Sequence, residues 1–111
     1  MAVIVETSTP RRLLRQFRDA IDEGTVQAWS CDADGDLTLT SDQMFGQAWM
    51  TPVADQEGRL VFNILGKSGQ SMSKSVYAIY HSRLVHTFLT HFDESCRMIR
   101  VTALPTSGDA I

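Results

Sequence analysis

The sequence has few cysteines, no long apolar run and no excess of positive charge, and each of these absences excludes a class of protein. Cys31 and Cys96 are the only cysteines in 111 residues, and neither belongs to a paired Cys-x-x-Cys or Cys/His spacing. No disulfide framework and no zinc site is therefore predicted. No stretch approaches the roughly 20 apolar residues that cross a bilayer, and the first residues do not form a signal peptide. We expect a soluble, cytoplasmic protein without membrane contact.

The charge balance disfavours nucleic acid as the main partner. Ten Lys and Arg residues stand against thirteen Asp and Glu residues, which gives a net charge of −3. Phosphate binding depends on clustered cations, so nucleic-acid binding is the least favoured of the functions considered. Hydrophobic residues make up 43% and charged residues 21% of the chain, as in ordinary globular domains. The length predicts a single domain over residues 1–111, with a frayed polar tail over 105–111.

Two amphipathic helices are predicted from capping residues and apolar spacing. The first has Thr9 as its N-cap and Pro10 at its first helical position, and Gly24 ends it. The second follows the small-residue loop GKSGQSMS, in which Ser71 or Ser73 can serve as the N-cap. Its apolar side chains share one broad face at helical spacing. They are Tyr77, Tyr80, Leu84, Val85, Phe88 and Phe92.

The remaining segments are typical of strands joined by tight turns. DADGD lies between TVQAWSC and LTLTS, and DQEG lies between QAWMTPV and RLVFNILG, which predicts two strand pairs. A short apolar run over residues 2–6 and the segment MIRVTAL add a strand at each end. The element order is (β)-α-β-β-β-β-α-β. It predicts an α+β two-layer sandwich, in which a mainly antiparallel sheet of four to six strands carries both helices on one face.

Two motifs that suggest metal or nucleotide binding each lack a necessary residue. An EF-hand loop beginning at Asp32 needs Gly at its sixth position and Glu at its twelfth, where the chain has Leu37 and Gln43. The Gly-Lys-Ser of FNILGKSGQS resembles a phosphate-binding loop, but Val61 stands where that loop requires its first Gly. We therefore predict no metal site and no cofactor, and a solvated hairpin turn at DADGD.

The second predicted helix carries the most informative polar cluster. His81 falls within the apolar arc, Tyr77 lies one turn before it, and Lys74 lies two turns before it on the same side. A histidine in this position is either a core imidazole that is hydrogen-bonded to backbone or to a tyrosine, or part of a pocket. In the second interpretation, the site binds a small molecule or an anion and has five candidate residues. They are Lys67, Lys74, Tyr77, His81 and Arg83.

The first predicted helix carries four arginines within eight residues, on and beside its polar face. They are Arg11, Arg12, Arg15 and Arg18. Such a stripe is either a solvated helix face or a contact surface for an acidic partner. Because the chemical motifs fail, the first hypothesis is a non-enzymatic protein-interaction or regulatory module that contacts a protein partner or itself through these arginines. The alternative is a small-molecule or anion-binding protein, conceivably an enzyme, with its site around Lys74 and His81.

Overall fold

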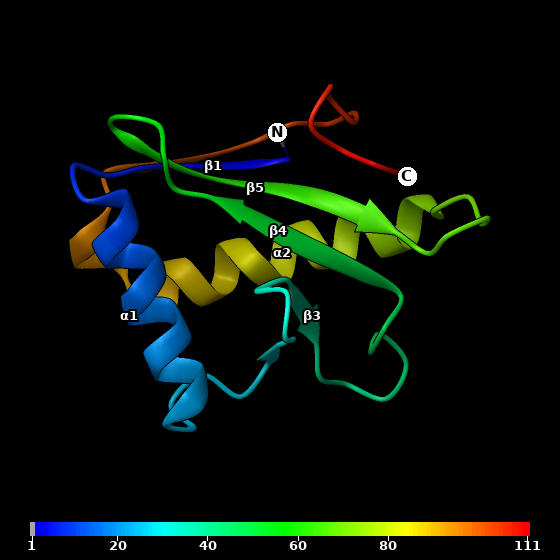
Figure 1. Ribbon diagram of the computed structural model, residues 1–111, viewed down its shortest axis with the longest axis horizontal. Coiled ribbons are helices and arrows are strands. Elements are labelled where there is room, and N and C mark those ends of the chain that lie inside the picture. The colour runs from blue at the N-terminus through cyan, green and yellow to red at the C-terminus, as the bar shows by residue number, and fades with distance from the viewer. Residues whose placement is uncertain (1) are drawn as a thin grey trace.

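The computed structural model describes residues 2–111 (Figure 1). In chain order its elements are β1 (Val3–Glu6), α1 (Pro10–Asp22), β2 (Trp29–Cys31), β3 (Leu37–Leu39), β4 (Ala48–Val53), β5 (Arg59–Gly66), α2 (Lys74–His91), the 3-10 helix η1 (Asp93–Ser95) and β6 (Met98–Val101). This order agrees with the predicted one and confirms the mixed α+β class. No helix within residues 2–111 is long and apolar enough to cross a membrane.

The six strands form one antiparallel sheet in the order β2-β3-β4-β5-β1-β6. The N-terminal strand β1 is inserted between β5 and β6, so that Val3 pairs with Phe62 on one side and with Val101 on the other. Both helices lie on one face of this sheet, where Phe17 of α1 and Phe88 of α2 both contact Phe62 of β5, and this arrangement confirms the predicted two-layer sandwich. Strand β6 ends the sheet on one side and β2 ends it on the other.

The helices begin where their sequence signals predict. Helix α1 has Thr9 at the N-cap position and Pro10 as its first residue, although the Thr9 side chain makes no capping hydrogen bond. Gly24 follows the helix with a φ of +82°, a conformation that glycine adopts without strain. At the start of α2, the Ser73 Oγ accepts a hydrogen bond from the Val76 N–H at 3.1 Å. Ser73, and not Ser71, is therefore the N-cap of α2.

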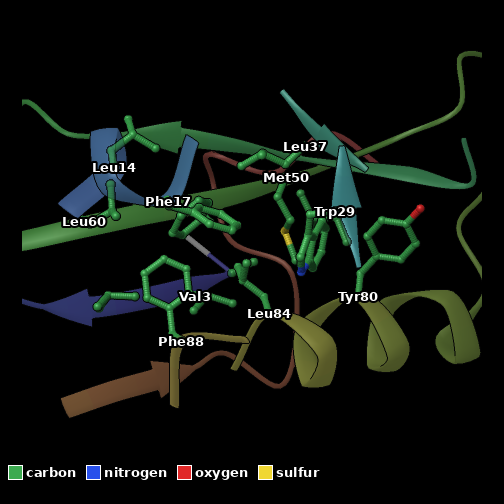
Figure 2. Close-up of a cluster of buried hydrophobic side chains, with 14 of the residues drawn as sticks. Val3, Leu14, Phe17, Trp29, Leu37, Met50, Leu60, Tyr80, Leu84 and Phe88 are labelled. Carbon is green, nitrogen blue, oxygen red and sulfur yellow. The ribbon is translucent and has the colours of Figure 1, made fainter. Parts of the chain in front are cut away.

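The core fills the space between the sheet and the two helices (Figure 2). Phe17 of α1 is fully buried and meets Phe62 of β5 and Phe88 of α2 edge-on, with ring centroids 6.1 and 5.0 Å apart. Trp29 is also buried, and its Nε1 donates a hydrogen bond to the Thr87 Oγ1 at 3.1 Å. These contacts join α1, the central strands and α2 into one apolar unit.

The C-terminal segment returns to the sheet beside β5. The Ala110 N–H donates to the Ile64 carbonyl, and the Gly66 N–H donates to the Ala110 carbonyl, at 3.0 and 2.7 Å. The Asp109 carboxylate accepts a further hydrogen bond from the Ile64 N–H at 3.0 Å. The tail over 105–111 was expected to fray, whereas in the structure these hydrogen bonds hold it against the part of β5 that β1 leaves unpaired.

Candidate functional site

A groove of about 460 Å³ runs between α2 and the end of β6. Its lining is largely apolar, and the seven residues besides His81 come from one side of α2 and from the segment that ends β6. They are Tyr77, Ala78, Ser82, Val85, Val101, Thr102 and Ala103. The Tyr77 hydroxyl donates to the Thr102 carbonyl at 2.8 Å and so ties α2 to the chain just after β6. This volume lies within the range of clefts that bind ligands or protein side chains.

Strand β6 borders the groove and is the outermost strand of the sheet. It pairs with β1 on one side, and no strand within residues 2–111 pairs with its other side. Met98 and Val101 are 53% and 48% exposed, which is unusual for apolar strand residues. Arg100 lies on the same face of the strand as Met98, opposite to Val101, and it donates a hydrogen bond to Glu6 at 3.0 Å. An unpaired strand edge with exposed apolar side chains is prone to pair with another chain.

Helix α2 continues this surface with a stripe of uncharged residues. Ala78, Ser82, Val85 and Leu89 follow one another at intervals of four, three and four residues, which places them along one side of the helix. Ala78, Ser82 and Leu89 are exposed, Leu89 to 57%, and Val85 is half-buried. We call the surface formed by this stripe together with Val101 of β6 the α2–β6 face. Large uncharged side chains on an open helix side are typical of contact surfaces.

His81 lies at the inner wall of the groove and is 4% exposed. Its Nδ1 is 2.6 Å from the Tyr77 carbonyl oxygen, to which it donates in the neutral tautomer, and its ring stacks on the Tyr77 ring with centroids 3.8 Å apart. Burial lowers the pKa of His81, and the Tyr77 carbonyl and the Asp109 carboxylate partly offset that effect. The Nε2 is buried and has no hydrogen-bond partner in the described chain. His81 is thus a neutral imidazole that is packed into the wall.

The five residues of the predicted ligand site do not lie together. Tyr77 and His81 line the groove, whereas the exposed Lys74 does not. Lys67 lines a separate cavity of about 130 Å³ beside the loop that precedes α2. Arg83 lines another cavity of about 90 Å³, which it shares with residues of β3 and the following loop. The structure therefore brings Tyr77 and His81 together and places the three cations in different surroundings.

The predicted arginine surface on α1 is mixed in charge. Arg11, Arg15 and Arg18 line a hollow of about 440 Å³ together with Asp19 and Asp22 of the same helix. The Arg18 Nη2 donates to the Gly35 carbonyl at 3.2 Å, so one of the four arginines contacts the β2–β3 turn. Arg12 is exposed and does not line this hollow. The carboxylates beside the arginines reduce the attraction that this surface has for an acidic partner.

The DADGD turn gathers three carboxylates, whose oxygens lie within 4.8 Å of one another. The Asp32 Oδ1 accepts hydrogen bonds from the Asp34 and Asp36 N–H groups at 3.0 and 2.9 Å, as in a turn that is closed by its first side chain. Gly35 provides the positive φ of +86° that this turn requires. The hairpin turn accounts for the position of the Asp32 carboxylate, and Asp34 and Asp36 take part in the turn through their backbone N–H groups.

Sequence reasoning missed the α2–β6 face, and comparison adds nothing to it. The signal that could have revealed it is the uncharged stripe from Ala78 to Leu89, which lies beside the predicted core face of α2 and shares only Val85 with it. No protein-family model, no curated protein and no solved structure matches the chain. The candidate function therefore depends on the geometry of this chain alone.

Proposed function

We propose that the protein is a non-enzymatic interaction module that contacts a protein partner through the α2–β6 face. The observation that supports this proposal is the continuity of two features that favour contact with another chain. The uncharged stripe of α2 borders the groove, and the unpaired edge of β6 borders the same groove. A partner that covers both features removes apolar surface from water and satisfies the free backbone groups of the strand.

The polar groups near the groove support a binding role more than a catalytic role. The Tyr77 hydroxyl is engaged by Thr102, and the His81 Nδ1 is engaged by the Tyr77 carbonyl. These bonds hold the groove walls in place. The groove thus has rigid walls and an apolar surface, the features that a hydrophobic side chain of a partner needs in order to be enclosed.

Site-specific photo-crosslinking in living cells tests the proposal. A benzophenone amino acid at Ser82 places the reactive group on the α2–β6 face, and the same amino acid at Gln56 places it in the β4–β5 turn. We expect a discrete protein adduct from position 82 that is absent from position 56. The adduct should be lost when Leu89 is also replaced by Glu. If position 82 gives no adduct, or if both positions give the same adducts, the α2–β6 face is not a protein-contact surface.

A further inference from the structure

We infer that the partner on the α2–β6 face is a second copy of this chain, joined to the first by antiparallel pairing of the two β6 strands around a two-fold axis. This inference rests on the proposed function, since it names the partner of the same face. Pairing of the two β6 strands joins the two six-stranded sheets into one continuous sheet that both copies share.

The backbone of β6 has the right groups free for this pairing. The Thr102 N–H donates to the Ala2 carbonyl, and the Thr7 N–H donates to the Gly58 carbonyl on the other side of β1. In an antiparallel ladder, successive residues direct their N–H and C=O groups to alternate edges. The N–H and C=O groups of the even-numbered residues of β6 therefore bond to β1. The N–H and C=O groups of Ile99 and Val101 point to the free edge. A second strand can bond there without breaking any bond to β1.

Charge and the extent of β6 select the register. A two-fold axis perpendicular to the sheet must pass between two copies of the same residue, because directly opposed residues of antiparallel strands point to the same face. An axis at Arg100 sets the two Arg100 side chains directly opposite each other, which is destabilising. An axis at Val101 pairs only Val101 within β6. An axis at Ile99 sets Ile99 opposite its own copy and Arg100 opposite Met98, so that three residues of β6 pair within the strand. Each Arg100 then keeps its hydrogen bond to Glu6 of its own chain.

The same rotation brings the two α2 helices together below the joined sheet. Both copies carry α2 on the same face of the sheet, so the two stripes from Ala78 to Leu89 lie on the sides that approach each other. Spacing of four, three and four residues is that of the contact seam between two packed helices. Ala78 and Ser82 are small enough for close approach, and Leu89 supplies apolar surface at the far end of the stripe.

The size of α2 permits a dimer interface. Eighteen helical residues extend about 27 Å at 1.5 Å each, and a helix packed on a sheet is roughly 20 Å thick. When the whole length of α2 takes part, the projected face is at most about 540 Å² per copy, and the two copies together reach the roughly 1,000 Å² expected of a biological interface. The opposite edge of the sheet is a poorer candidate, because β2 has three residues and leads into the acidic DADGD turn.

Solution mass tests the dimer. Analytical ultracentrifugation of the full chain at 1–100 µM should give twice the monomer mass of 12.4 kDa. The variants Val101→Glu and Leu89→Glu should weaken self-association at least tenfold. The control Phe45→Glu alters a residue that is 60% exposed in the loop before β4 and should leave the mass unchanged. Circular dichroism verifies folding, and if one face variant fails to fold, the other still decides the outcome.

Cysteine scanning tests the register. In a background with Ser at positions 31 and 96, Ile99→Cys should form a disulfide-linked dimer under mild oxidation, since hydrogen-bonded opposite residues have Cα atoms about 5.5 Å apart. Arg100→Cys should form little disulfide-linked dimer, because position 100 lies away from the axis. The inference is overturned if the wild-type chain stays monomeric at 100 µM and the Ile99→Cys variant gives no disulfide-linked dimer. In that case, a photo-crosslinked adduct between position 82 and a different protein leaves the proposed function standing. The absence of any adduct from position 82 overturns both the inference and the proposed function.

Discussion

The hydroxyl of Tyr80 should contribute more to stability than that of Tyr77, although both tyrosines lie on α2 one turn apart. The Tyr80 hydroxyl is buried with Thr38, whose Oγ1 lies 2.9 Å away, and it also donates to the Met44 carbonyl. It thereby fastens the loop before β4 to α2. Tyr80→Phe removes this donor and leaves a carbonyl without its partner in a place that water reaches poorly.

The expected cost follows from that unpaired carbonyl. Leaving a buried acceptor unsatisfied costs about 1–3 kcal/mol, so Tyr80→Phe should lower the free energy of unfolding by that amount. For a chain of 111 residues the entropy of unfolding is about 0.23 kcal/mol/K, at roughly 2.1 cal/mol/K per residue. The melting temperature should therefore fall by about 4–13 °C. Tyr77 is half-buried, and its partner Thr102 lies at the groove mouth, where water can replace the hydroxyl. Tyr77→Phe should cost under about 1 kcal/mol.

Urea denaturation followed by the fluorescence of the tryptophans measures both variants under one condition. The wild type and the two variants should unfold with the same dependence on urea concentration, so that their midpoints compare stability alone. All samples should be measured at one protein concentration, because the proposed self-association would add to apparent stability. If Tyr77→Phe costs as much as Tyr80→Phe, or if Tyr80→Phe costs nothing, the contact of Tyr80 with Met44 and Thr38 does not hold the loop.

Three further predictions test the rest of the structure. Burial lowers the pKa of His81, so the unfolded chain takes up a proton near its ordinary value of 6.5 before the folded chain does. The contribution of His81 to the free energy of unfolding should be constant above that pH and fall below it. Urea midpoints at pH 7.5 and 5.5 should show this loss in the wild type and in the control His86→Gln, but less of it in His81→Asn. Phe17→Ala should cost about 3–5 kcal/mol in the same urea assay, because it leaves a cavity between Phe62 and Phe88, and a loss under about 1 kcal/mol would contradict the packing. Arg11→Glu should raise the melting temperature slightly, since the first turn of α1 holds no acidic residue and an anion there favours the helix dipole, whereas Arg15→Glu, further along the helix, should not.

Local sequence signals predicted most of the fold because the elements obey local rules. Pro10 and Ser73 mark helix starts through hydrogen bonding and φ alone, and Gly35 marks a turn through its positive φ. The place of β1 could not be predicted in this way. Its insertion between β5 and β6 depends on partners about 60 and 95 residues away, and no local pattern specifies which of several apolar strands will be neighbours.

The candidate site was only half predicted for a related reason. Helical spacing correctly placed Tyr77 and His81 near each other, because residues four apart share one side of a helix. Lys67 and Arg83 were grouped with them by proximity in sequence, yet the loop before α2 and the turn of the helix direct these cations to different cavities. The polarity of the tail predicts fraying, but a short polar segment can be held by backbone hydrogen bonds wherever a strand leaves part of its edge unpaired.

The α2–β6 face shows why a contact surface can escape sequence reasoning while its parts are visible. Val85 was assigned to the core because apolar residues at helical spacing normally face the protein interior. In the folded chain α2 packs against β4 and against Trp29 of β2, and its stripe from Ala78 to Leu89 lies on the side of the helix that borders the groove beside β6. An apolar arc that exceeds the width of its own core requires a second surface to cover it. That surplus, together with the free groups of Ile99 and Val101, is what another copy of the chain would bury.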